Sequence, residues 1–135
     1  MDINFGEYKF SDNKNLISID KVYELLGNTY WANNRKIETT IKAIENSICI
    51  GIYFKEAMVG FARIVTDYAT MYWLCDVIID ENHRKNGLGK KLIETITELK
   101  ELEGMFGILA TRDAHGLYEK YGFKKVGEKY MRKDV

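Results

Sequence analysis

The sequence predicts a single α/β domain with a mixed central sheet flanked by helices. Three observations lead to this prediction. The chain has 135 residues, 46% apolar and 30% charged, which fits one globular domain over residues 1–135. Apolar residues at helical spacing come before and after a middle segment whose apolar runs have the length of strands. The last third contains an apolar run, a helical segment and a second apolar run, which is the order of a βαβ unit.

The first third is expected to form one edge strand and two helices. Apolar and aromatic residues between positions 3 and 10 fit a short edge strand. A helix should begin after Ser18, whose hydroxyl can cap it, and end at Gly27-Asn28. After an aromatic loop, a second helix is expected to begin near Asn33 or Asn34.

The middle third is expected to form three strands. Only a short connection that contains Lys55-Glu56 joins the apolar runs 48–54 and 58–66, which predicts a hairpin. The run 71–79 is apolar at nearly every position, so we expect a central strand that is covered on both faces. Asp76 is the charged exception within it.

A long helix and a short strand should complete the βαβ unit. The helix is expected from Leu88 to Gly104, with charged residues on the opposite face and a strand over residues 106–110 after it. Five apolar residues at spacings of three and four should be buried, namely Leu88, Leu92, Ile96, Leu99 and Leu102.

A short helix and a hairpin are expected to close the fold. Asp113 can cap the helix, and Gly122 occupies the position at which glycine ends one. Residues 123–126 and 128–131 then predict a closing hairpin around Gly127.

Composition and charge exclude several classes of function. A net charge of zero and a pI of 6.7 argue against a nucleic-acid-binding protein. Cys49 and Cys75 lie inside apolar runs, which indicates free thiols rather than a disulfide framework or a zinc site. No signal peptide is recognisable, and the longest apolar run is too short to span a membrane. The sequence therefore predicts a cytoplasmic protein without a metal, bound to neither nucleic acid nor membrane.

The segment between the third strand and the long helix predicts an anion site. Arg84 is followed by Gly87-Leu88-Gly89 at the start of the helix. The first N–H groups of a helix have no intrahelical partners, and the helix dipole favours negative charge there. A P-loop is excluded because Lys91 follows Gly89-Lys90, and a dinucleotide fingerprint is excluded because Leu92 stands where the third glycine is needed.

Two motifs resemble those of one enzyme superfamily. Residues 83–89, His-Arg-Lys-Asn-Gly-Leu-Gly, are similar to the acetyl-CoA signature R/Q-x-x-G-x-G/A of the GNAT N-acetyltransferases. Residues 117–123, Leu-Tyr-Glu-Lys-Tyr-Gly-Phe, resemble the C-terminal L-Y-x-x-x-G-F element of the same family. A helix and a strand separate the two motifs, in the family's order. The resemblance implies a GNAT-like sheet with a splayed strand before the cofactor-binding helix.

The resemblance also implies a co-substrate, acetyl-CoA, and the residues that bind it. The backbone of Val77, Ile78 and Ile79 would pair with the pantetheine arm, and one of their N–H groups would polarise the thioester carbonyl. The diphosphate would be bound by the glycine turn and its cations, namely Arg84, Lys85, Asn86, Gly87, Leu88, Gly89 and Lys90.

Catalytic roles follow for two side chains. Tyr118 matches the family's tyrosine and would donate a proton to the leaving thiolate. Asp76 is the candidate general base, with a pKa raised by burial; the alternative is a carboxylate satisfied by backbone or by Arg63. Cys75 has no histidine partner in view, so direct attack by the amine in a ternary complex is favoured over a ping-pong mechanism.

The acceptor is expected to be a primary amine of a small molecule or a protein. Its pocket should lie between the first two helices and the hairpin, and the resemblance allows a homodimer. The alternatives are a non-catalytic acyl-CoA-binding sensor or partner module and an α/β domain without cofactor. The candidate lining residues are Tyr23, Tyr30, Trp31, Arg63, Asp67 and Tyr68.

Overall fold

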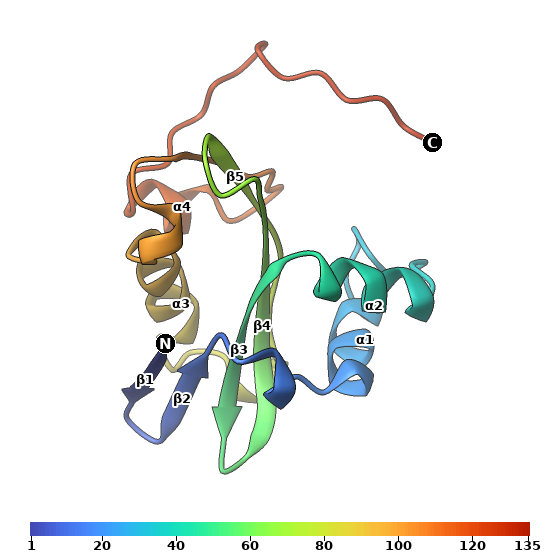
Figure 1. Cartoon of the computed structure of the whole chain (residues 1–135), viewed down its shortest axis with the longest axis vertical. Coiled ribbons are helices and arrows are strands. Elements are labelled where there is room, and N and C mark those ends of the chain that lie inside the picture. Colours follow the sequence, from blue (N-terminus) through green and yellow to red (C-terminus); the bar gives the residue numbers. More distant parts are fainter.

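The computed structural model describes residues 1–135 and contains one six-stranded sheet with helices on both faces (Figure 1). The strands lie in sequence order, and all neighbours are antiparallel except β5 and β6, which are parallel. Helices α1 and α2 lie on one face, and α3 and α4 on the other. The predicted mixed α/β architecture is confirmed. The strands are β1 (Asp2–Phe5), β2 (Tyr8–Ser11), β3 (Ile48–Phe54), β4 (Ala57–Thr66), β5 (Met71–Ile79) and β6 (Phe106–Ile108).

The N-terminal segment forms a hairpin instead of the single edge strand that was predicted. β1 and β2 pair across a turn in which Gly6 has a φ of 61°, a backbone conformation that favours glycine. β2 then pairs with β3, so the hairpin extends the sheet. Its main contribution to the core is Phe10, which is fully buried.

Helix α1 (Ile19–Gly27) confirms its prediction, whereas α2 (Ile37–Glu45) begins later than predicted. The Ser18 hydroxyl accepts a hydrogen bond from the Lys21 N–H at 3.2 Å and caps α1. Residues 28–34 form turns, and the side chains of Trp31 and Arg35 hydrogen-bond to Asp76 on β5. These contacts across the sheet face hold the loop away from helical geometry.

The two hairpin turns of the central sheet follow from their residues. Lys55 and Glu56 both have positive φ, 48° and 71°, as a tight turn between right-twisted strands requires. Between β4 and β5, the Asp67 carboxylate accepts hydrogen bonds from the N–H groups of Ala69 and Thr70. Such aspartate-centred turns stabilise the reversal of the chain.

Helix α3 (Leu88–Thr97) is shorter than predicted, because the chain becomes extended at Leu99. A 3₁₀ turn, η3 (Lys100–Leu102), follows. Its spacing of three residues per turn puts Leu99 and Leu102 toward the same side, and both stay buried at 7% and 4% exposure. All five predicted core residues of this segment are buried.

The sheet separates two apolar cores. The larger one lies under α3 and α4 and includes Ile50, Leu92 and Tyr118. The smaller one lies under α1 and α2 and includes Val22 and Phe61. Strand β5 borders both cores, and the candidate active site lies along this strand.

The C-terminal segment corrects two predictions. Helix α4 (His115–Glu119) is present and ends in the predicted way, because Gly122 has a φ of 91° and the Phe123 N–H donates to the Tyr118 carbonyl at 3.3 Å. The helix is not capped by Asp113, since Ala114 is its N-cap and no side chain makes a cap hydrogen bond; the Thr111 hydroxyl accepts from the Ala114 N–H in the turn before the helix.

The predicted closing hairpin over residues 123–126 and 128–131 is wrong, since no strand follows β6. The segment leaves the body of the protein as an extended chain (Figure 1). Its few apolar side chains alternate with charges and offer no continuous face to bury: Val126, Tyr130 and Met131 are all more than half exposed.

Candidate active site

A bulge at Asp76 changes which side chains of β5 face each core. Arg63 on β4 pairs with Cys75, but Phe61 pairs with Ile78, so β5 carries one extra residue between these pairs. Asp76 has a φ of 52°, an uncommon value for a residue with a side chain. The extra residue turns Asp76 toward the α1–α2 side, and Val77 and Ile79 pack on the larger core.

β5 and β6 pair over only three residues and then separate. The pairs are Met71–Phe106, Tyr72–Gly107 and Trp73–Ile108. Beyond Trp73 no strand pairs with β5 on that edge, so the backbone of Val77, Ile78 and Ile79 has no strand partner there. This is the predicted splay, and it leaves main-chain groups free to bind an extended ligand.

The glycine turn at the start of α3 has the geometry of an anion site. Gly87 is the N-cap with a φ of 76°, and no side chain caps the helix. Lys85 also has a positive φ, 67°. Asn86 donates from Nδ2 to the His83 carbonyl at 2.9 Å, which fixes the turn. The first N–H groups of α3 are therefore available to an anionic ligand.

The positively charged side chains around this turn differ in the contacts that they make with the rest of the protein. Arg84 donates from Nε to the Ile79 carbonyl at 3.1 Å, so its guanidinium is fixed at the end of β5. Lys91 pairs with Glu94 at 2.9 Å and lies near the ring of Phe5. Lys90 is exposed at the helix start.

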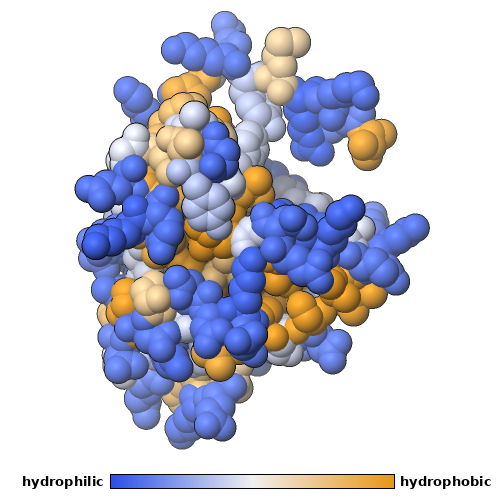
Figure 2. Space-filling view, viewed as in Figure 1, coloured by the Kyte–Doolittle hydropathy of each residue, from blue (hydrophilic) through white to orange (hydrophobic).

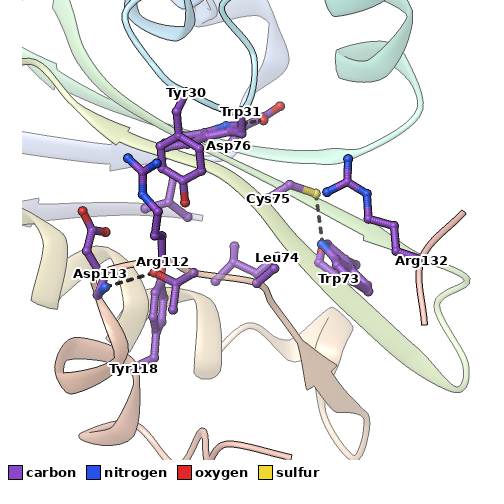
Figure 3. Close-up of a pocket in the computed structure, with 14 residues that line it drawn as sticks. Tyr30, Trp31, Trp73, Leu74, Cys75, Asp76, Arg112, Asp113, Tyr118 and Arg132 are labelled. Atoms are coloured by element: carbon purple, nitrogen blue, oxygen red, sulfur yellow. Dashed lines mark hydrogen bonds between the residues drawn. The ribbon is translucent and has the colours of Figure 1, made fainter. Parts of the chain in front are cut away.

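A cavity of about 560 Å³ opens where β5 and β6 separate. It lies between β5, the β6–α4 loop and the α1–α2 loop (Figure 3). In the space-filling view, apolar surface is visible between the α3–α4 side and the α1–α2 side of the molecule (Figure 2). The cavity brings together both predicted catalytic residues, Tyr118 and Asp76, with Val77.

Tyr118 enters this cavity from α4. The residue is 8% exposed, and its ring packs against Phe123 at a centroid distance of 5.9 Å. Burial raises its pKa to about 12, with smaller contributions from Tyr30 and Asp113. The phenol therefore keeps its proton at neutral pH, as a proton donor must.

Asp76 is held by two arginines and a tryptophan. Its Oδ2 accepts from Arg63 Nε and from Arg35 Nη1, both at 2.8 Å. Its Oδ1 accepts from Trp31 Nε1 at 3.1 Å and from Arg35 Nη2 at 3.3 Å. The predicted rise of its pKa is wrong: although burial opposes ionisation, the two arginines hold the pKa of Asp76 below its usual range.

Sequence reasoning missed several residues of the cavity. Arg112, from the β6–α4 loop, lies over the ring of Tyr30 at 3.8 Å, and Asp113 lines the cavity beside it. Of the predicted acceptor residues, Tyr30 and Trp31 line the cavity. Arg63 lies behind Asp76, while Tyr23, Asp67 and Tyr68 are not part of the lining. No sequence motif marked Arg112 or Arg35, because their partners are distant in the chain.

Comparison with known proteins identifies the family. Residues 45–125 match the model of the acetyltransferase (GNAT) domain.

The chain belongs to the GNAT family of acetyltransferases.

A crystal structure of a GNAT-family protein from Xanthomonas campestris is 32% identical, with a TM-score of 0.92, and covers 98% of this chain and 96% of that one. The N-acetyltransferase ycf52 of Pyropia yezoensis is 30% identical over 91% of this chain and 74% of its own length. An acetyltransferase of Gibberella zeae is 26% identical, and the match covers 69% of this chain and 64% of that relative.

Members of this family use acetyl-CoA, and the free N–H groups of α3 and the splay beside β5 fit a coenzyme A molecule. No group of three or more His, Cys, Asp or Glu side chains is arranged to hold a metal ion. Cys49 and Cys75 are free thiols, as predicted. None of the helices combines the length and the apolar character needed to cross a membrane.

Proposed function

We propose that this GNAT domain transfers the acetyl group of acetyl-CoA to a primary amine by direct attack, with Tyr118 as the proton donor. The observation that carries the proposal is the splay between β5 and β6: Tyr118 and Val77 line the cavity there, and the same strand ends at Ile79, whose carbonyl accepts from Arg84 just before the open start of α3.

Each part of the site has a separate task. The N–H groups of residues 85–90, with Arg84, bind the diphosphate. The backbone of residues 77–79 pairs with the pantetheine amides, and one N–H polarises the thioester carbonyl. When bound, acetyl-CoA supplies an activated acyl group.

Tyr118 supplies a proton at the sulfur. The acceptor ammonium first loses one proton to water. The neutral amine nitrogen then bonds to the carbonyl carbon, the C–S bond breaks, and the sulfur takes the phenol proton. The nitrogen passes its second proton to the phenolate, directly or through a water molecule, so that Tyr118 is protonated again. A pKa of about 12 supports this role, because Tyr118 stays protonated at neutral pH.

The geometry of Asp76 favours a structural carboxylate, bound by protein donors, over a general base. All four contacts of its carboxylate are with protein donors, so no lone pair is left for an incoming ammonium. We assign Asp76 a positioning role: it ties Trp31 and Arg35, and thereby the α1–α2 loop, to the rim of the cavity. Cys75 is not required, since burial raises the pKa of its thiol and no histidine contacts it.

Steady-state kinetics of Tyr118→Phe tests the proposal. Thiol release from acetyl-CoA with a panel of amines should fall by about 10²–10⁴-fold in kcat, as expected for loss of a general acid. Stabilisation by coenzyme A should be retained. Tyr121→Phe, in the turn just after α4 and half-buried, is the matched control and should keep the wild-type rate.

Two other results would contradict the proposal. Equal rates for the wild type and Tyr118→Phe would exclude Tyr118 as the acid. Stabilisation by coenzyme A without turnover on any amine would favour a non-catalytic acyl-CoA-binding module.

A further inference from the structure

Two adjacent residues of opposite charge line the cavity without partners. Arg112 and Asp113 follow each other in the β6–α4 loop. Neither side chain forms a hydrogen bond or an ion pair with the rest of the chain: Arg112 reaches from the loop to Tyr30, and Asp113 lies exposed beside it (Figure 3). Most other charges around the cavity are neutralised: Asp76 by Arg35 and Arg63, and Arg132 by Asp134.

Arg112 is fixed in a way that suits a carboxylate. Its guanidinium carbon lies 3.8 Å from the centre of the Tyr30 ring. Stacking on an aromatic ring uses the face of the guanidinium and leaves its N–H donors at the edge. This edge matches the two oxygens of a carboxylate, which it binds with two parallel hydrogen bonds.

Asp113 is the carboxylate of the cavity that remains free for a cation. It was expected to cap α4, but no side chain caps that helix. Asp113 and Tyr118 line the same cavity. An ammonium group bound by Asp113 therefore lies in the cavity that the proposed proton donor enters.

We infer that the acceptor is a small amino acid, a molecule with both an ammonium and a carboxylate group. This inference rests on the proposed acetyl transfer. Arg112 binds the carboxylate, and Asp113 binds the ammonium that becomes the nucleophilic amine. The cavity of about 560 Å³ also has to receive the acyl end of acetyl-CoA, which leaves space for a small acceptor.

Other amines match these charges less well. A polyamine has no anion for Arg112 and brings positive charge close to it. A lysine side chain or a protein N-terminus has an amine without a carboxylate at amino-acid distance. A small amino acid supplies a partner to both Arg112 and Asp113.

A matched panel of acceptors tests the inference. Initial rates are measured with L-alanine, L-glutamate and L-phenylalanine, with the carboxamide of each, with the dipeptide alanyl-alanine and with spermidine. At least one amino acid should exceed its own carboxamide in kcat/KM by about 10- to 100-fold, the value of a charge-assisted pair of hydrogen bonds.

Variants then assign the preference to the two residues. Arg112→Gln should lower kcat/KM for the amino acid to the level of its carboxamide and leave the carboxamide unchanged. Asp113→Asn should lower both, because both acceptors carry the ammonium. Arg132→Gln is the matched control, since Arg132 lines the opposite end of the cavity beside Trp73 and is paired with Asp134 (Figure 3); it should keep the preference.

A binding readout separates recognition from turnover. The N-acetylated amino acid, added with coenzyme A, should raise the Tm of the wild type but not that of Arg112→Gln. If carboxamides or spermidine are acetylated as well as the amino acids, the inference is wrong while acetyl transfer stands. If no amine is acetylated, the proposed function fails and the acceptor inference fails with it.

Discussion

Replacing Asp76 by asparagine should destabilise the protein more than it slows the chemical step. The carboxylate has a side-chain exposure of 2%, and each of its oxygens accepts from two donors. An amide has only one acceptor oxygen. Whichever way the new amide turns, its NH₂ group faces two donors, which leaves two of the four contacts unmade and the charges of Arg35 and Arg63 uncompensated.

The magnitude follows from the burial of the partners. Removing one member of a buried ion pair costs about 3–5 kcal/mol. The side chains of Arg35 and Arg63 are 21% and 14% exposed, so water compensates part of their charge and the lower end of this range applies. We expect a loss of about 3 kcal/mol in the free energy of unfolding and a fall in Tm of roughly 10 °C.

Urea denaturation and steady-state kinetics of Asp76→Asn measure the two effects. Asp134→Asn is the control, because it makes the same substitution in an exposed ion pair, and it should change stability by less than about 0.5 kcal/mol. In Asp76→Asn the KM for the acceptor should rise more than kcat falls, since the α1–α2 loop loses its anchor. Unchanged stability combined with a large loss of kcat would instead identify Asp76 as the general base and refute this reasoning.

The pH dependence of stability gives an independent check. The pKa of Asp76 is lowered by folding, so its contribution is present above the unfolded pKa near 3.9 and is lost as the pH falls through the folded value. The difference in stability between the wild type and Asp76→Asn should be constant from pH 5 to pH 8 and shrink only below about pH 4.

Three further predictions concern the cofactor and the reaction. Acetyl-CoA at 100 times its Kd should stabilise the wild type by about 2.7 kcal/mol, and Gly89→Val should abolish this stabilisation. A Cβ at Gly89 would lie 3.8 Å from Leu117, an ordinary contact, so the new side chain fits the protein but occupies the space of the ligand. Gly27→Val is the control and should keep the stabilisation. Cys75→Ser should keep kcat, and mass spectrometry of the wild type with acetyl-CoA alone should find no acetylated enzyme, which a ping-pong mechanism requires. Because the pKa of Tyr118 is about 12, kcat should show no fall from its ionisation below pH 10, and a fall with a midpoint near pH 8 would contradict its role.

The elements that could be predicted from the sequence are those fixed by local chemistry. Ser18 caps a helix, Lys55-Glu56 make a tight turn, and Gly87 and Gly122 adopt the positive φ that their positions need. The resemblance of two short motifs predicted the splay and the position of Tyr118 in one cleft.

Features that depend on distant residues could not be predicted. The start of α2 is set by contacts of Trp31 and Arg35 with Asp76, more than 40 residues away. The pKa of Asp76 follows from the same arginines, so burial alone gave the wrong direction. The stacking of Arg112 on Tyr30 joins two loops whose proximity only the folded chain creates.

The central claim is that one splayed strand edge joins the anion site of α3 to the buried acid Tyr118. A crystal structure with coenzyme A tests it most directly. The diphosphate should contact the N–H groups of residues 85–90, the pantetheine should hydrogen-bond to the backbone of Val77–Ile79, and the sulfur should lie within hydrogen-bonding distance of the Tyr118 hydroxyl. A coenzyme A molecule bound elsewhere, or a sulfur atom separated from Tyr118 by protein, would contradict the claim.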